Sequence, residues 1–465
     1  MSRNYGALAR DCNLSSSEFV KNITSSEGNE DIIWGLRCGR LDALSIGEED
    51  DESDCLNFTV REGDDLGWLG YYIGNSSALE ALHINDMPGD VDRIEDFLGG
   101  LNRNRSIQEL WIYDDLGDAV SEKLGDFFRN NKRLTNLELR YFEIGDENAR
   151  KLGLALRHMS LKSLALTQNL LSKEGFAEIV NAAGTQSQIE NLSVSGNDIG
   201  RVDCTTLGTL LGSGALNKLK NLDLEYNGID DSSLQILASG LSNNTTLGVL
   251  SLCGNRSITG GGLRSLIPFL QSESCSLRDF YCYHNNCIDD VGAAALADGL
   301  AKNKSLLRLW FDPTDCGIEE GWQSFLTLLC DTSSINNTYL SNHTLELIGE
   351  SCNYGSSINQ VHDRVRDLLR MSTHTTRKEV AIRKIFLSHR DLDMEPFFEW
   401  ELKFLPLIIS WFKKSHGYDV FPTTNIQCRK LSAVYKFIRG LPLQVVHGRQ
   451  TPCRRCGRKR RFIET

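Results

Sequence analysis

The amino-acid sequence predicts an α/β solenoid, in which strand-and-helix units stack into a curved, open horseshoe with a parallel β-sheet on the concave side and helices outside. Two observations predict it: an L-x-x-L-x-L motif that recurs about every 28 residues, and a helical pattern after most occurrences. Composition agrees, because 40% of the 465 residues are hydrophobic and only 8 are proline. Such a chain is expected to fold over most of its length.

The motif occurs ten times, with successive first positions 27 to 30 residues apart. Successive side chains of a strand point to opposite faces, so the third, fifth and seventh positions of each motif are expected on the concave surface. Ten stacked units are therefore predicted. Their first positions are Leu79, Ile107, Leu134, Leu161, Ile189, Leu219, Leu247, Leu277, Leu306 and, in a degenerate form, Ile335.

Asparagine recurs after the last apolar position of five successive motifs, with two residues between them. An amide at that place can bond the backbone of the turn that leaves the strand, which predicts a structural ladder and not a ligand site. Acidic pairs such as Asp289 and Asp290 begin several of the helical stretches that follow, where they suit helix N-termini. The ladder residues are Asn169, Asn197, Asn227, Asn255 and Asn285.

These repeats resemble the leucine-rich-repeat superfamily, specifically its ribonuclease-inhibitor-like class, whose strand-plus-helix unit has about 28 residues. The resemblance covers Leu79 to about Glu350 and implies a leucine-rich-repeat solenoid. The whole layout also resembles a eukaryotic protein family that joins this repeat class to a helical tail with a PFFEWELK-like stretch. That second likeness implies the architecture and no activity.

Five segments are expected along the chain. Residues 1–30 are predicted to be a mobile leader, and residues 31–78 an irregular N-terminal cap with an acidic insertion. Residues 79–350 hold about ten repeats. Residues 351–442 are predicted to form an α-helical C-terminal cap over the last repeat, and residues 443–465 a basic tail.

Three shorter patterns lie inside the predicted caps. Leu41 to Ile46 matches the repeat motif once more, and Leu56 to Val60 is a weaker candidate strand. In the C-terminal cap, residues 375–390 have a helical pattern.

Charge is distributed unevenly. Residues 42–65 carry ten acids and one base, whereas residues 439–465 carry eight bases and one acid. With +7 in that last segment and −12 overall, the other residues carry −19. An acidic body repels nucleic acid and favours a basic protein partner. Neither an export signal nor an apolar run long enough to span a bilayer is present, so a cytoplasmic location without a membrane partner is expected.

We expect the concave face to bind a protein partner. Outward Trp and Tyr residues gather near its two ends beside acids, and such residues supply large contact areas with a polar handle. The alternative is that these aromatics fill the floor of a curved sheet, to which their strand propensity suits them. The candidate residues are Glu109, Trp111, Tyr113, Glu138, Arg140, Asp223, Glu225, Asp279, Tyr281, Tyr283, Arg308, Trp310, Asp312 and Tyr339.

No catalytic or cofactor-binding motif occurs, so a non-enzymatic protein without cofactor is expected. Dispersed histidines such as His83 and His284 are expected to be structural. Cys453 and Cys456, with Cys428 and His447 upstream, have the ligand types of a zinc site, but a single C-x-x-C predicts no metal by itself. The basic tail is a candidate nuclear-import signal. Its residues are Arg454, Arg455, Arg458, Lys459, Arg460 and Arg461.

The resemblance offers two alternatives to an interaction scaffold. The Ran GTPase-activating protein family is similar in repeat class, which implies a GTPase-activating or GTPase-binding role. That family ends its repeats in an acidic tail, whereas this chain ends in a basic one. The repeat tails of NOD-like receptors are also similar and imply a sensor-type role, although no nucleotide-binding motif accompanies the repeats here.

Overall fold

The computed structural model describes most of the repeats and parts of both ends. The residues described are 4–11, 23–24, 26, 28–47, 55–61, 65–85, 91–113, 118–141, 144–169, 171–186, 188–197, 199, 204–285, 289–311, 319–349, 360–372 and 376–389. The chain divides into two compact units, one of Met1–Asp331 with Leu340–Val380 and the other of Thr332–Tyr339 with Ala381–Thr465. The sheet lies in the first unit.

Twelve short strands of the first unit form one parallel sheet, which confirms the predicted fold class. Its spatial order is β12-β11-β10-β9-β8-β7-β6-β5-β4-β3-β1-β2, so successive repeats are neighbours. The register is constant, with the fourth motif position opposite the next fourth position, as in Leu137 opposite Leu164. The strands are β1 Ala43–Ile46, β2 Leu56–Phe58, β3 Ala81–Ile84, β4 Glu109–Ile112, β5 Asn136–Arg140, β6 Ser163–Thr167, β7 Asn191–Ser193, β8 Asn221–Asp223, β9 Val249–Ser251, β10 Asp279–Tyr281, β11 Arg308–Trp310 and β12 Leu347–Gly349.

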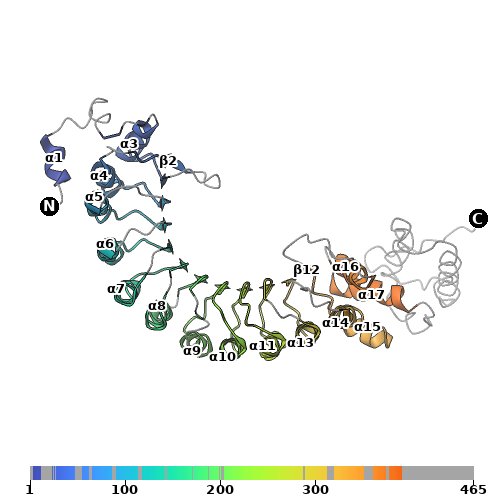
Figure 1. Ribbon diagram of the computed structural model, residues 1–465. Helices are drawn as coiled ribbons and strands as arrows, with labels where there is room; N and C mark the ends of the chain where they lie inside the picture. Colours follow the sequence, from blue (N-terminus) through green and yellow to red (C-terminus); the bar gives the residue numbers. More distant parts are fainter. Residues whose placement is uncertain are drawn as a thin grey trace, which may run out of the picture. The chain divides into compact units, whose positions relative to one another are not determined.

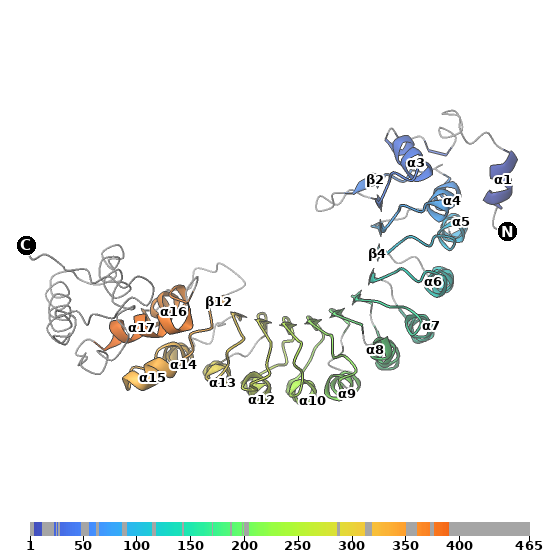
Figure 2. The ribbon, with the colours of Figure 1, turned by 180° about the vertical axis from the view of Figure 1, so that it is seen from behind.

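Within the first unit, the helices that connect successive strands lie on the outer side of the curved sheet (Figure 1). Figure 2 shows the same arrangement from behind. The helices are α1 Tyr5–Asp11, α3 Asn29–Arg37, α4 Leu66–Asn75, α5 Val91–Leu101, α6 Asp118–Asn130, α7 Asp146–Leu156, α8 Lys173–Gln186, α9 Thr205–Ser213, α10 Asp231–Leu241, α11 Gly260–Arg264, α12 Ile267–Leu270, α13 Asp290–Leu300, α14 Glu319–Leu329, α15 Ile335–Leu340, α16 Gln360–Arg370 and α17 Arg377–Ser388.

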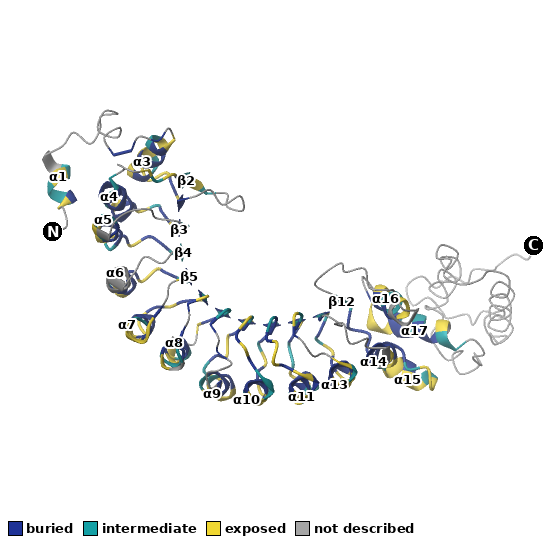
Figure 3. Cartoon of the chain, in the orientation of Figure 1, coloured by how far each residue is buried: buried dark blue, intermediate teal, exposed yellow. Residues whose placement is uncertain are grey.

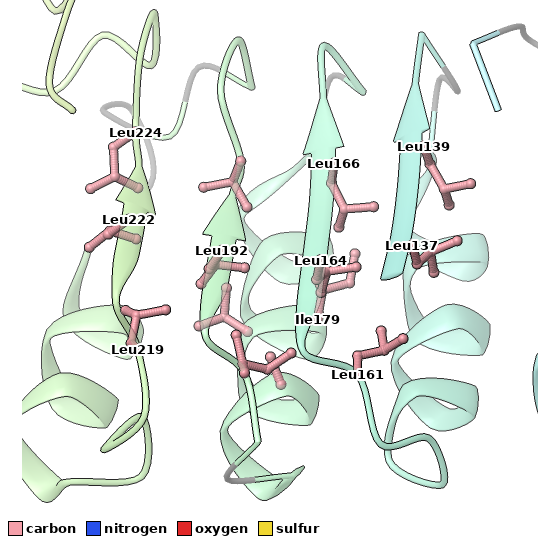
Figure 4. Packing of buried hydrophobic residues seen from close by; sticks show 14 of the residues in the cluster. Leu137, Leu139, Leu161, Leu164, Leu166, Ile179, Leu192, Leu219, Leu222 and Leu224 are labelled. Atoms are coloured by element: carbon pink, nitrogen blue, oxygen red, sulfur yellow. The ribbon is translucent and has the colours of Figure 1, made fainter. Parts of the chain in front are cut away.

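The leucine motif supplies the core between the sheet and the helices. Leu164, Leu166 and Leu192 are buried and point from their strands towards the helical layer, from which Ile179 of α8 meets them (Figure 4). Exposed positions of the helices lie mainly on the side away from the sheet (Figure 3). Full burial stabilises the fold by about 1.5–3 kcal/mol for each such side chain. One continuous core therefore holds the repeats together.

The five asparagines that follow the strands form a ladder of hydrogen bonds between repeats. The backbone N–H of Asn197 donates to Asn227 Oδ1 at 2.9 Å, and the N–H of Asn227 donates to Asn255 Oδ1 at 3.0 Å. Asn197 Nδ2 donates to the carbonyl groups of Leu166 and Val194 at 2.6 and 2.7 Å. All five side chains are buried. The ladder pairs the polar backbone groups that stacking of the turns takes out of water.

A second set of buried asparagines lies three residues before the first motif position in five repeats, and it was not predicted. Asn303 Oδ1 accepts from the N–H groups of Ser305 and Leu306 at 3.0 and 2.7 Å, and its Nδ2 donates to the Leu270 carbonyl of the preceding repeat at 2.7 Å. The signal in the sequence is the constant offset of three residues. The members are Asn104, Asn131, Asn244, Asn303 and Asn342.

Paired aspartates connect the helices of successive repeats. Asp230 caps α10 by accepting from the Ser233 N–H at 2.8 Å, and Asp231 accepts from the Thr259 N–H at 2.7 Å, at the start of the next helix. Asp289 and Asp290 divide the roles in the same way. Asp289 accepts from the Gly292 N–H of its own helix, α13, and Asp290 accepts from the Gly321 N–H of the next. One carboxylate therefore satisfies its own helix N-terminus and the other bonds the following repeat.

The N-terminal edge of the sheet is formed by β2 and not by β1. Strand β1 pairs with β3 on one side and with β2 on the other, so the chain passes beyond β1 to make the edge. Asn29, at the start of α3, accepts from the Thr59 N–H at 3.1 Å and donates to the Thr59 carbonyl at 2.8 Å. This side chain satisfies the backbone directly after the edge strand.

Helix α1 lies within the segment predicted to be a mobile leader, and its contact with α4 was not predicted. The Tyr5 hydroxyl donates to Asp65 at 2.9 Å, and its buried ring meets Trp68 edge-on with 5.2 Å between ring centres. Gly67 provides the space, because a Cβ there would lie 2.1 Å from Tyr5 Cζ. One aromatic ring with a polar tip anchors the segment to α4, and a single residue of this kind gives no periodic signal in the sequence.

The prediction of a tenth strand at Ile335 is wrong, because INNTYL forms helix α15. The fourth position of that degenerate motif is Thr338, which offers no apolar side chain to the core. The strand of the last repeat is β12 instead, and Ile348 pairs opposite Leu309. Asn342, three residues before Leu345, is the pre-strand asparagine of this repeat.

Beyond β12 the described residues form two helices. Helix α17 lies within the segment predicted to be helical over residues 375–390, whereas α16 was not predicted. Val365 and Leu369 of α16 are buried in the same core cluster as Leu329 of α14. The rest of the predicted α-helical cap and the basic tail lie outside the described residues.

We expect Asn227→Ala to lower the free energy of unfolding by about 2–3 kcal/mol, because it leaves the buried Asn197 N–H without its acceptor. The shift of the urea midpoint measures the effect. Asn217→Ala is the control, since Asn217 is exposed and its loss should change stability by less than about 0.5 kcal/mol. Equal midpoints for the two variants would contradict the role assigned to the ladder.

Candidate functional site

The outward strand positions form three rows across the concave face of the sheet. The first row holds the third motif positions, the second row the fifth, and the third row the seventh. Because the register is constant, each side chain lies beside its counterparts from the neighbouring repeats, as Trp111 lies between His83 and Glu138. Residues about 28 positions apart in sequence are therefore neighbours on this face.

Ring stacking and one arginine connect the N-terminal part of the face. His83 stacks on Trp111 with 4.0 Å between ring centres and planes 5° apart, and Trp111 lies 6.2 Å from Tyr113. The Arg140 guanidinium covers the Tyr113 ring at 4.6 Å and donates to Glu138 at 3.0 Å. We call these five residues the N-terminal cluster. In this cluster, Arg140 places its positive charge beside both the Tyr113 ring and the Glu138 carboxylate.

His83 was not among the predicted surface residues. It is largely buried, as expected of a structural histidine, and its Nε2 lies 3.2 Å from Glu109 Oε1. Its ring nevertheless extends the stacked surface by one repeat. The signal for it was present, because His83 occupies the fifth motif position, the same position that identifies Trp111 one repeat later.

A second cluster occupies the C-terminal part of the face. Tyr281 and Trp310 stack with 6.1 Å between ring centres and planes 7° apart, and Tyr283 meets Tyr281 edge-on. The Arg308 guanidinium donates to both carboxylate oxygens of Asp279, at 2.9 Å for Nη2 to Oδ2. This pairing raises the pKa of Arg308. We call these five residues the C-terminal cluster, and its carboxylate is again neutralised by an arginine of the chain.

Small side chains and two carboxylates line the face between the clusters. Asp223 accepts from the Ser193 hydroxyl at 2.7 Å, and Glu225 accepts from the Ser251 hydroxyl at 2.6 Å. Among the described residues neither carboxylate forms an ion pair, whereas the other carboxylates in the three rows each have an arginine or histidine partner. The centre of the face therefore carries uncompensated negative charge.

Burial controls ionisation beside Glu225. Removal from water and the charge of Glu225 raise the pKa of the Cys253 thiol to about 12. Burial likewise raises the pKa of the Tyr283 hydroxyl, and Cys253, Glu225 and Tyr226 act in the same direction. Both groups stay protonated at neutral pH, so neither is an activated nucleophile.

Directly after the third row, the backbone turns in the left-handed conformation in six successive repeats. We call these six residues the turn row. Glycine adopts this conformation freely, whereas other residues lose about 1–2 kcal/mol there. Tyr141 and Tyr226 are more than half exposed. The φ angles are 62° for Tyr141, 55° for Gln168, 71° for Gly196, 50° for Tyr226, 68° for Gly254 and 57° for His284.

Twelve of the fourteen predicted partner-binding residues occupy the three rows, on the strands or directly after them. Tyr339 does not, because it lies on α15, and its assignment to the concave face is wrong. Asp312 lies outside the described residues, as do Cys453 and Cys456. A partner-binding role for the twelve stays a prediction.

Within the described ranges, no group of three or more His, Cys, Asp or Glu side chains lies close enough to hold a metal ion. The cysteines among them are free thiols. No described helix is long and apolar enough to cross a membrane.

We expect iodoacetamide at pH 8 to alkylate Cys38 and to leave Cys253 unmodified in the folded protein. Cys38 is exposed, whereas a pKa of about 12 leaves only about one Cys253 thiol in ten thousand ionised at that pH. Peptide mass spectrometry measures both sites, with full alkylation in guanidinium as the control. Equal labelling of the two cysteines in the folded protein would show that the floor of the face is open to reagent.

No family model matches the chain. NACHT, LRR and PYD domains-containing protein 5 of Mus musculus is 29% identical over 223 residues, which are 46% of this chain and 18% of that protein. Ribonuclease inhibitor of Sus scrofa is 31% identical over 240 residues, which are 50% of this chain and 51% of the inhibitor. The chain thus spans about half the length of the inhibitor and less of the first relative.

Two solved structures show a weak likeness. The leucine-rich repeat-containing protein LegL7 of Legionella pneumophila is 17% identical with a TM-score of 0.41, covering 68% of this chain and 97% of that one. The yeast Rad7 and Elc1 complex gives 14% identity and a TM-score of 0.39, with coverages of 62% and 75%. Likenesses at this level add nothing to the argument. The repeat register and the asparagine ladder show a leucine-rich-repeat solenoid, and the two sequence relatives support the ribonuclease-inhibitor-like class of repeat.

Proposed function

We propose that the chain is a non-catalytic scaffold that recognises a protein partner through the concave face of its repeats. The observation that carries the proposal is the pair of aromatic clusters that the strand register holds on one face. Trp111, Tyr281 and Trp310 are each stacked on a neighbour before any partner arrives. Binding would therefore cost little side-chain entropy, and Trp and Tyr are the residues that most often dominate interface energies.

The size of the face suits a protein ligand. Twelve strands at about 4.8 Å spacing give a sheet about 50 Å long, and the three rows are about 13 Å wide. Their product, about 650 Å², approaches the roughly 800 Å² that one partner contributes to an ordinary stable interface. A small molecule would contact only a fraction of such a surface.

The alternative, that the aromatics only fill the floor of the sheet, leaves one atom unexplained. Trp310 Nε1 is buried and has no hydrogen-bond partner within the described residues. A ring used for packing alone is normally placed so that its N–H is satisfied. Packing within the described residues therefore leaves this buried donor unsatisfied, so floor packing alone does not account for the position of Trp310.

The binding partners of the relatives say little about this chain, because only part of each relative is matched. Ribonuclease inhibitor is named for the enzyme it inhibits, and its matched part is about half of it. The GTPase-regulating and sensor-type alternatives are not favoured by any residue of the concave face. A cytoplasmic location, with nuclear import through the basic tail, stays a prediction, as does the absence of catalysis.

We expect a combined Trp111→Ala, Tyr281→Ala, Trp310→Ala variant to lose its protein partner in affinity capture from the source cell's extract with mass spectrometry. Truncation of one such anchor commonly costs about 2 kcal/mol, or about thirty-fold in affinity, so the three together should abolish capture.

The control is Trp34→Ala, which removes a half-exposed aromatic ring from α3, away from the three rows. Thermal unfolding must show that the combined variant is folded at the capture temperature. Capture of the same proteins by the wild type, the control and the folded combined variant would refute the proposal.

A further inference from the structure

Tyr226 is not required by the turn that it occupies. Its φ of 50° lies in the left-handed region, where a residue other than glycine loses about 1–2 kcal/mol. The same turn is closed by Gly196 one repeat before and by Gly254 one repeat after. Tyr226 therefore lowers the stability of a turn at which the preceding and the following repeat both have glycine.

Tyr226 is not required by the core either. More than half of its side chain is exposed. The ring lies across Gly254 of the next repeat, where a Cβ would come within 2.3 Å of Tyr226 Cδ1. The tyrosine thus combines an unfavourable backbone conformation with an exposed position, and strained residues of this kind cluster at functional sites.

The surroundings of Tyr226 attract cations. It directly follows Glu225 and, with Glu225, lies near enough to the Tyr283 hydroxyl to influence its ionisation. The Glu225 backbone N–H donates to Asp223, so both carboxylates belong to one short segment leaving β8. Carboxylates and the faces of aromatic rings both favour a positive charge. No described lysine or arginine is paired with either carboxylate.

In two other places on the same face, an arginine of the chain itself supplies the positive charge next to a carboxylate and aromatic rings. In the N-terminal cluster, Arg140 covers the Tyr113 ring and bonds Glu138. In the C-terminal cluster, Arg308 bonds Asp279 beside stacked rings. Each cluster combines ring, carboxylate and guanidinium. At the end of β8 the ring and the carboxylates are present, and no described lysine or arginine supplies the cation.

We propose that Asp223, Glu225 and Tyr226 form a subsite for a lysine or arginine side chain of the protein partner, with the cation between the carboxylates and over the exposed tyrosine ring. This inference rests on the proposed function, because the subsite adjoins the concave face. The subsite requires that the partner present a protruding lysine or arginine at this point. An anionic partner, such as nucleic acid or an acidic membrane surface, is repelled by the same two carboxylates.

The test selects a random twelve-residue phage-displayed peptide library on the full-length chain and measures each enriched peptide by calorimetry. Enriched peptides should carry Lys or Arg. Tyr226→Asn should weaken them about five-fold, which matches about 1 kcal/mol for a cation over a ring. Asp223→Asn with Glu225→Gln should weaken them at least ten-fold and flatten the salt dependence.

Stability separates this role from a structural one. Asparagine tolerates the left-handed conformation, so Tyr226→Asn should melt at or near the wild-type temperature while binding falls. Tyr226→Phe, which keeps the ring, should keep most of the affinity. Leu154→Asn removes an equally exposed side chain from the outer helix α7 and should change nothing.

The outcomes distinguish the subsite from the proposed function. Peptides that bind the Tyr226 and carboxylate variants as tightly as the wild type overturn the subsite. If those peptides are still lost on truncating Trp111, Tyr281 and Trp310, the concave-face function stands. Peptides indifferent to every variant, or a library from which nothing is enriched, count against both. Peptides without a basic residue that still depend on Tyr226 would also overturn the subsite.

Discussion

The described repeats depend on the hydrogen bonds that buried asparagines make between them. Stacking strand-and-helix units buries leucines favourably, but it also removes the turn backbone from water, and an unpaired buried N–H or C=O costs about 1–3 kcal/mol. The Asn227 side chain pairs such groups in two repeats. Its Oδ1 accepts from the Asn197 N–H of the preceding repeat, and its Nδ2 donates to the Glu225 carbonyl of its own. Pre-strand asparagines such as Asn303 do the same at the opposite ends of the strands. Since each amide reaches only its neighbour, the ladders also hold the register constant.

The constant register is what creates a surface. It brings Trp111 beside His83 and Tyr281 beside Trp310, although the members of each pair are about one repeat apart in sequence. The core and the ladders are satisfied by inward side chains and backbone groups, so the outward positions can vary without loss of the fold. The fold and the outward surface therefore depend on different positions of the same strand.

The left-handed turns are an exception to this separation. The repeat fixes the left-handed backbone of these turns. The residue there is therefore either glycine or one that lowers the stability of the protein. Gly254 is doubly constrained, because its φ is 68° and the Tyr226 ring occupies the place of a Cβ. A tyrosine at such a turn carries a stability cost that packing does not explain, whereas an exposed Leu154 on an outer helix carries none.

The sequence by itself determined the repeat class, nine of the ten repeat strands, the asparagine ladder and the outward positions, because each follows from a local period and the alternation of strand residues. It did not determine that INNTYL is a helix or that Tyr5 is anchored against Trp68. Nor did it determine that Asp279 pairs with an arginine whereas no described arginine pairs with Asp223. Those outcomes depend on which side chains from distant repeats meet, and neighbours about 28 residues apart leave no local pattern. Tertiary stacking decided them, since only the stacked register sets which carboxylates are neutralised and which remain open to a partner.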